Sequence, residues 1–111
     1  MVSVLTHAYD PWLVLTVDGE LDTFGAPELR NAAVSASSAG QNHIVIDLSR
    51  VDFIDSIGLG AIIGVLKRCR QQDGELRVVC GASPVRRVME MCKLDQAMVV
   101  GDDLAEVLRN D

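Results

Sequence analysis

Short apolar runs along the chain predict the strands of a β-sheet. Residues 2–5 and 13–17 are rich in aliphatic and β-branched side chains, and they flank Asp10-Pro11, a dipeptide typical of turns. This pattern predicts a hairpin at the start of the chain. Residues 44–48 are apolar at almost every position, which is typical of a central strand buried on both faces. Two further apolar runs predict strands at residues 76–80 and 98–100.

Four other segments have the pattern of helices. Helix formers and a first-turn proline predict a helix over residues 26–38. The Ser/Ala/Gly tract of residues 35–40 ends this helix and leads into a loop. Ser83, followed by proline, is a typical helix start, and Asp102 and Asp103 are placed to cap a last helix. Apolar residues with helical spacing form three faces: Leu59/Ile62/Ile63/Leu66 in a helix that ends near residue 73, Val85/Val88/Met89/Cys92, and Leu104/Val107/Leu108.

The order of these elements predicts an α/β fold. A hairpin followed by alternating helices and strands implies one mixed sheet of four to five strands, with about four helices packed on it. The length of 111 residues is that of one domain, so we expect residues 1–111 to form a single unit without an internal repeat or linker. Because only 4% of the residues are aromatic, the core must consist of aliphatic side chains and methionine.

The overall charge argues against several kinds of partner. The net charge of −6 opposes binding to nucleic acid or to an anionic membrane surface. Lys67, Arg68 and Arg70 do cluster, but together with two glutamines they are typical of the solvated face of a helix. No segment has the length of a membrane span or the pattern of a leader peptide, so we expect a cytoplasmic protein.

The cysteines and histidines do not suggest a metal or cofactor site. Cys69, Cys80 and Cys92 are odd in number and lack Cys-x-x-Cys spacing, so each is expected to be a small buried hydrophobic residue. His7 and His43 lie near predicted strand starts and are more typical of surface or turn residues than of catalytic bases. We therefore expect no metal and no cofactor.

The segment Asp55-Ser56-Ile57-Gly58-Leu59-Gly60 lies where the central strand connects to the second helix. A helix start gathers free backbone N–H groups and the positive end of the helix dipole. A serine at this position either caps the helix or presents a functional hydroxyl, and local physics favours the cap. Gly58, Gly60 and Gly64 each lower helix propensity, so their presence in a helix needs a reason. Gly60 and Gly64 lie one turn apart, and a close approach of this face to a neighbouring element explains them better than a ligand cradle does.

Catalytic interpretations of the same segment fit poorly. A nucleophile elbow needs glycine two residues before the serine, where this chain has Ile54. The glycine spacing misses the dinucleotide fingerprint by one residue, and no Gly-Lys-Ser/Thr ending follows. Two pairs of carboxylates occur, Asp52 with Asp55 and Asp102 with Asp103. The second pair fits helix capping. We therefore expect the protein not to be an enzyme.

Residues 51–60, Val-Asp-Phe-Ile-Asp-Ser-Ile-Gly-Leu-Gly, resemble the signature of STAS domains, specifically of the bacterial anti-sigma factor antagonists. Residues 19–22, Gly-Glu-Leu-Asp, resemble a second short motif of the same family. The predicted order of strands and helices also agrees with that fold along nearly the whole chain.

This resemblance implies a switch. A protein of this kind binds an anti-sigma factor serine kinase, which frees a sigma factor, and is inactivated when the kinase phosphorylates the serine after the aspartate, here Ser56. A phosphatase acting on phosphorylated Ser56 would restore binding. The partner-binding residues that follow are Asp22, Asp52, Asp55, Ser56, Ile57, Gly58 and Gly60. Asp22 is equally compatible with an ordinary turn.

One residue departs from the family pattern, and two other functions stay open. Ile57 stands where antagonists often carry a second hydroxyl or another small residue, which bears on the choice of kinase. A first alternative is a STAS scaffold subunit of a transporter or stress-sensing complex that is never phosphorylated. A second is a nucleotide-binding module, suggested by the glycines.

Overall fold

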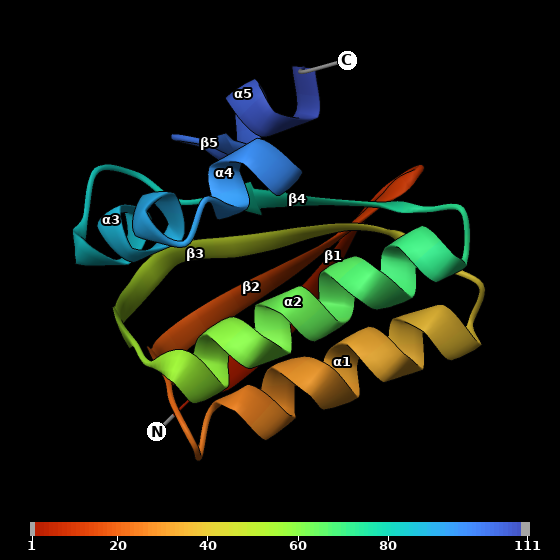
Figure 1. Ribbon diagram of the computed structural model, residues 1–111. Coiled ribbons are helices and arrows are strands. Elements are labelled where there is room, and N and C mark those ends of the chain that lie inside the picture. The colour runs from red at the N-terminus through yellow and green to blue at the C-terminus, as the bar shows by residue number, and fades with distance from the viewer. Residues whose placement is uncertain (1, 110–111) are drawn as a thin grey trace.

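The computed structural model describes residues 2–109 as a mixed β-sheet flanked by helices (Figure 1). The elements, in chain order, are β1 (Ser3–Tyr9), β2 (Trp12–Leu21), α1 (Ala26–Ser38), β3 (His43–Ile54), α2 (Ser56–Gln71), β4 (Glu75–Val79), α3 (Pro84–Met91), α4 (Leu94–Ala97), β5 (Val99–Gly101) and α5 (Leu104–Arg109). The predicted α/β class and mixed sheet are confirmed.

The five strands lie in the order β1-β2-β3-β4-β5. β1 is antiparallel to β2, as the predicted hairpin requires, and the other neighbouring strands are parallel. β3 is the middle strand, and Ile44, Val45 and Ile46 are all buried. The prediction of a central strand covered on both faces is therefore correct.

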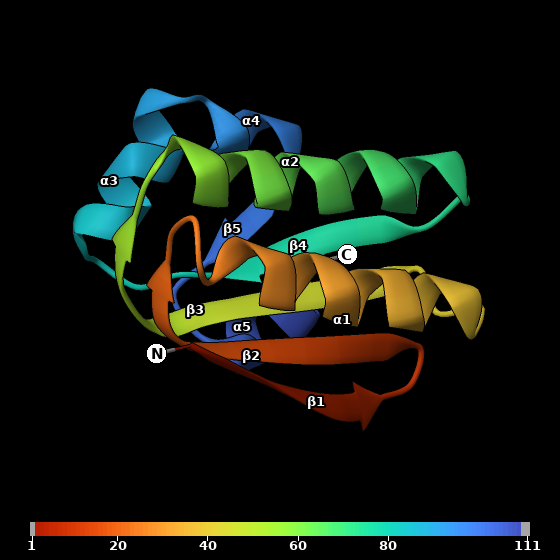
Figure 2. The same ribbon diagram turned by 90° about the horizontal axis from the view of Figure 1, so that it is seen from below.

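The helices form two unequal layers on the sheet. Figure 2 shows α1 and α2 side by side in front of the strands, with α5 behind them. The larger core lies between the sheet and helices α1 to α4, where Leu15, Ile46 and Leu29 are fully buried. A smaller cluster, including Val14, Val45 and Val107, lies between α5 and the opposite face of the sheet. No helix within residues 2–109 is long and apolar enough to cross a membrane.

One boundary and one short helix differ from the sequence prediction, whereas α1 ends at Ser38 as predicted. β3 continues to Ile54, so the predicted connection of residues 49–57 shrinks to Asp55 alone. α4 follows Lys93, which adopts a left-handed conformation with φ 59°, and no apolar periodicity marks so short a helix. These errors arise where neighbouring elements, rather than local propensity, determine how far a segment extends.

The predicted helix caps are confirmed in part. The Ser83 hydroxyl accepts the backbone N–H of Arg86 at 3.2 Å, which starts α3 as expected. Asp103 accepts the N–H of Glu106 at 2.8 Å, but Asp102 instead pairs with the Arg86 guanidinium at 2.9 Å. Asp102 therefore links α3 to the segment before α5 rather than capping a helix.

Arg77 is the one charged residue among the buried side chains of the described chain, and it anchors α5 to the sheet. Its Nε lies 2.8 Å from a Glu75 carboxylate oxygen, and its Nη1 donates to the carbonyl of Val107 at 2.8 Å. The guanidinium also lies 4.5 Å from the ring centre of Trp12, within cation–π range. The sequence analysis did not single out this residue.

We expect Arg77→Ala to lower the free energy of unfolding by about 2–3 kcal/mol, because it leaves the Val107 carbonyl without its buried donor. Arg50→Ala is the matched control, since Arg50 pairs with Asp18 at 3.6 Å on the exposed surface. This variant should lower the free energy of unfolding by less than about 0.5 kcal/mol. Urea unfolding followed by circular dichroism measures both variants. Equal losses would contradict the anchoring role.

Candidate functional site

Asp55 is the residue that starts α2. Its backbone is extended, with φ −116° and ψ −172°, and one carboxylate oxygen accepts the N–H groups of Ile57 and Gly58, each at 3.0 Å. Its carbonyl accepts the N–H of Leu59 at 2.9 Å, which begins the helical hydrogen bonding. The helix cap that local physics favoured for Ser56 therefore belongs to Asp55 instead. The carboxylate wins because it can take two of the free N–H groups at once.

Ser56 is consequently left with an exposed side chain at the first position of α2. Its hydroxyl makes no hydrogen bond to any other residue between 2 and 109. The positive end of the helix dipole lies at the same place, so added negative charge on this side chain would be favourable locally. The geometry leaves Ser56 free for chemistry that a capping serine would resist.

Gly58 fixes the position of this helix start against the sheet. A Cβ atom at residue 58 would collide with the carbonyl oxygen of Leu21, at the end of β2. Added Cβ atoms at Gly60 and Gly64 would meet nothing within 4 Å. The close packing predicted for Gly60 and Gly64 is thus wrong within the described residues, and of these three glycines it is Gly58 that makes such an approach.

Asp22 forms the same kind of turn at the end of β2. Its carboxylate accepts the N–H groups of Phe24 at 3.0 Å and Gly25 at 2.9 Å, and its carbonyl accepts the N–H of Ala26 at 2.8 Å. A Cβ atom at Gly25 would collide with the carbonyl oxygen of Glu20. The turn role considered for Asp22 is confirmed, and its partner-binding role stays a prediction.

The two turns are repeats of one another, which the sequence analysis missed. Residues 21–26 read Leu-Asp-Thr-Phe-Gly-Ala, and residues 54–59 read Ile-Asp-Ser-Ile-Gly-Leu. Leu21 pairs with Ile54 across the parallel strands, so both turns leave the same edge of the sheet. The shared Asp-Thr/Ser-apolar-Gly order was the available signal, but it is too short to stand out without the register of the strands.

Apolar side chains accompany the acidic ones at this edge. Phe24, which follows the first turn's threonine, is 86% exposed, and Ile57, its equivalent in the second turn, is 44% exposed. Phe53 near the end of β3 is also half exposed, beside the exposed Asp52. Aromatic and aliphatic side chains of this size in the open are typical of surfaces that a partner covers. We name Asp22, Phe24, Asp52, Phe53, Asp55, Ser56 and Ile57 the strand-edge surface.

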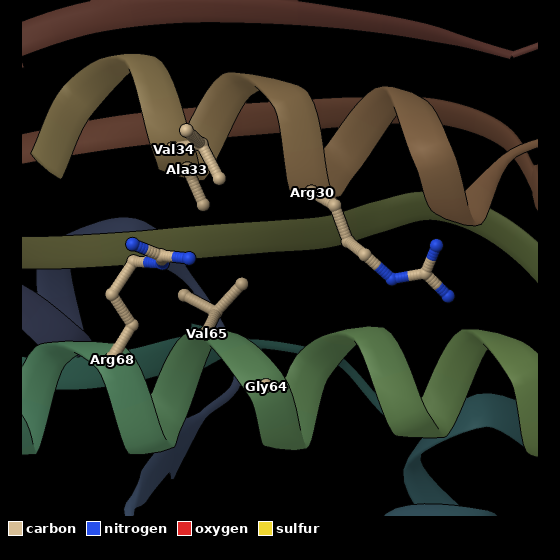
Figure 3. Close-up of a pocket in the computed structure, with 6 residues that line it drawn as sticks. All are labelled: Arg30, Ala33, Val34, Gly64, Val65 and Arg68. Carbon is tan, nitrogen blue, oxygen red and sulfur yellow. The ribbon is translucent and has the colours of Figure 1, made fainter. Parts of the chain in front are cut away.

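A second, separate depression lies between α1 and α2. It is lined by Arg30, Ala33, Val34, Gly64, Val65 and Arg68. Figure 3 shows the side chains of Arg30 and Arg68 extending from their two helices into the space between them. The bare backbone of Gly64 forms part of one wall, so this glycine helps to leave the depression open.

The remaining predicted residues do not converge on a site. Among residues 2–109, no three His, Cys, Asp or Glu side chains gather closely enough to hold a metal ion. His43 begins β3, at the opposite end of that strand from Ser56, and packs edge-on against Trp12 with ring centres 5.5 Å apart. Lys67, Arg68 and Arg70 are exposed on α2 as predicted.

The cysteines match their prediction in two positions of three. Cys69 and Cys80 are buried, whereas Cys92 is exposed at the end of α3, so the expectation of burial is wrong there. Burial raises the pKa of the Cys69 thiol to about 11, even though Arg68 acts in the opposite direction, and it raises the pKa of Cys80 as well. Neither buried thiol is a ready nucleophile near neutral pH.

The fold and the site define a class of protein: an α/β domain with a mixed five-stranded sheet and two aspartate-capped turns at the same ends of its strands. The chain belongs to the STAS domain family, whose model matches residues 3–107. It is 31% identical over 101 residues to an anti-sigma-B factor antagonist of Staphylococcus aureus, an alignment that covers 91% of this chain and 94% of that protein.

Solved structures agree with this assignment. An anti-sigma factor antagonist from Mycobacterium paratuberculosis superposes with a TM-score of 0.88 at 28% identity, covering 97% of this chain and 92% of the other. The Bacillus cell fate determinant SpoIIAA in its phosphorylated form superposes with a TM-score of 0.75 at 20% identity, covering 96% of each chain, which shows a shared fold.

We expect Asp55→Ala to lower the free energy of unfolding by about 1–2 kcal/mol, because two N–H groups lose their acceptor. Ser56→Ala is the control and should change stability by less than about 0.5 kcal/mol, since the hydroxyl stabilises no helix N–H. Thermal and urea unfolding measure both variants. A larger loss for Ser56→Ala than for Asp55→Ala would restore the serine as the cap.

Two glycine variants test the contact between α2 and β2. Gly58→Ala should lower the free energy of unfolding by about 3 kcal/mol, because the new methyl group meets a backbone oxygen that cannot move freely. Gly64→Ala should raise it by about 0.5–1 kcal/mol, since helix propensity improves and the space is open. Urea midpoints that move in the same direction for both variants would contradict this assignment.

Proposed function

We propose that this chain is a cytoplasmic anti-sigma factor antagonist that binds an anti-sigma factor kinase while Ser56 is unmodified and releases it when Ser56 is phosphorylated. The relatives from Staphylococcus aureus and Mycobacterium paratuberculosis carry the name of antagonist, which is a regulatory role rather than a catalytic one. The observation that carries the proposal is the free, exposed hydroxyl of Ser56 beside a helix start that Asp55 already caps.

Modification of Ser56 is compatible with the folded state. Because the hydroxyl holds no hydrogen bond within residues 2–109, its conversion to a phosphate ester breaks no contact of the fold. The helix N-terminus favours the added charge by about 0.3–1 kcal/mol. SpoIIAA, a protein of the same fold, has been solved in both an unphosphorylated and a phosphorylated form. The fold therefore tolerates a covalently bound phosphate.

Phosphorylation would act on the interface instead. A phosphate adds about −1.5 to −2 charges at neutral pH, and here it joins the carboxylates of Asp52 and Asp55. Burying such a group without a cationic partner costs several kcal/mol, whereas about 3 kcal/mol already weakens binding more than a hundredfold. The unfavourable desolvation exceeds the local gain at the helix start. Binding is lost while the domain stays folded.

The strand-edge surface supplies the contacts of the unmodified state. Phe24, Phe53 and Ile57 offer apolar area that a partner can cover, and Asp22 and Asp52 add carboxylates near the same strand ends. Gly60, exposed one turn along α2, leaves its backbone open to a close partner. Ile57 stands directly beside the phosphoacceptor, so its bulk selects which kinase closes over this helix start. A phosphatase that removes the phosphate from Ser56 returns the protein to the binding state.

The proposal is tested with candidate anti-sigma factor kinases from the bacterium that encodes the chain. Incubation with kinase and ATP should place a phosphate on the peptide that contains Ser56, as mapped by mass spectrometry, and Ser56→Ala should carry none on that peptide. The phosphorylated protein should bind the kinase at least a hundredfold more weakly than the unmodified one in calorimetry. Thermal melting of both forms checks that the fold is preserved.

Substitutions at Ser56 give a second measurement that needs no ATP. Ser56→Asp should weaken kinase binding at least tenfold, because the carboxylate is buried without a counter-charge, and Ser56→Ala should bind as the wild type does. Both variants should keep melting temperatures close to that of the wild type. Equal affinity of the two variants, or a kinase that binds none of the three forms, would overturn the proposed switch.

A further inference from the structure

Thr23 occupies the same position in the first turn that Ser56 occupies in the second. Each residue follows an aspartate whose carboxylate accepts the N–H groups two and three residues ahead, at 2.9–3.0 Å in all four bonds. In each turn the aspartate carbonyl accepts the N–H four residues ahead, at 2.8 Å after Asp22 and 2.9 Å after Asp55. The two turns thus agree in these three hydrogen bonds around the hydroxyl residue, although α2 begins at Ser56 itself and α1 begins three residues after Thr23.

The environment of the two hydroxyl residues agrees as well. Both side chains are exposed, and neither hydroxyl bonds to another residue in the part of the chain that the structure describes. Each is followed by an exposed apolar residue and then by a glycine pressed against a backbone carbonyl of β2. Because Leu21 pairs with Ile54, the turns lie on adjacent strands at one edge of the sheet. A partner that reaches Ser56 faces Thr23 at the same edge.

We infer that Thr23 is a second phosphoacceptor, presented to a serine/threonine kinase in the same backbone geometry as Ser56. The inference rests on the proposed phosphorylation of Ser56. In the reaction the Thr23 hydroxyl oxygen forms a bond to the γ-phosphorus of ATP, the bond from that phosphorus to the β–γ bridging oxygen breaks, and ADP leaves. The hydroxyl proton passes to a base of the kinase.

The consequence is a switch with two positions of control. A phosphate on Thr23 adds about −1.5 to −2 charges next to Asp22 and beside the exposed ring of Phe24. It therefore opposes burial of the strand-edge surface for the same reason as a phosphate on Ser56. A kinase that modifies either residue lowers partner binding, and a phosphatase must clear both to restore it.

The test uses the full chain, tagged and expressed in the bacterium that encodes it, from growing and from stationary cultures. Phosphopeptide mapping compares wild type, Ser56→Ala, Thr23→Ala and the double variant. We expect Ser56→Ala to carry phosphate on Thr23, Thr23→Ala to carry it on Ser56, and the double variant to lose at least nine-tenths of the total. Thr23→Ser in the Ser56→Ala background should keep the modification, as the conservative replacement.

Two controls separate turn geometry from simple exposure. Ser49 is also exposed, and its N–H bonds to Asp47 at 2.9 Å, but it lies within β3 rather than in a turn. Ser49→Ala, made in the Ser56→Ala background, should leave the phosphate on Thr23 unchanged. Asp22→Ala should lower Thr23 phosphorylation at least tenfold, and by a larger factor than it lowers Ser56 phosphorylation, because its carboxylate holds the turn around Thr23 only. Thermal melting shows that each variant is folded.

The outcomes distinguish this inference from the proposed function. Phosphate on Ser56 with none on Thr23, in wild type and in Ser56→Ala, overturns the second site and leaves the Ser56 switch intact. Absence of phosphate from both residues in every culture overturns both. Phosphate on Ser49 at the level of Thr23 overturns the role of the turn, since exposure alone would then be sufficient.

Discussion

The structure depends on the contact between the start of α2 and the end of β2. Gly58 lies against the carbonyl of Leu21 so closely that no side chain fits, and Asp55 holds the first turn of the helix through two N–H groups. Together these features set the position of the serine between them. Because Asp55 caps the helix, the hydroxyl of Ser56 is not needed for capping. A rigid part of the fold can therefore present a free hydroxyl.

Charge is distributed unevenly over this frame. The carboxylates of Asp22, Asp52 and Asp55 lie at the strand edge, whereas α2 contains no acidic residue and ends with Lys67, Arg68 and Arg70. The edge that carries Ser56 is therefore already negatively charged. The phosphorylation proposed for Ser56 is therefore expected to act on binding far more than on folding.

The sequence predicted the fold better than it predicted the site. Apolar runs located all five strands and apolar periodicity located three of the helices, because one face of each element must be buried. Helix formers and a first-turn proline located α1. The boundaries of β3 and the short helix α4 were missed, since neither has a local signal. At the site, the motif was recognised by resemblance, but the cap was assigned to Ser56 instead of Asp55, as both residue types favour a helix start.

What the sequence determined by itself was the class of fold, the central place of β3 and the segment at which a hydroxyl meets a helix start. Only the tertiary structure decided which residue caps the helix, which glycine is compressed, and that residues 22–25 and 55–58 form equivalent turns. The reason is that these properties depend on the register of β2 with β3, where Leu21 lies beside Ile54. The register between distant strands is fixed only when their buried faces pack together in the sheet, because a shift by one residue would turn every side chain to the other face.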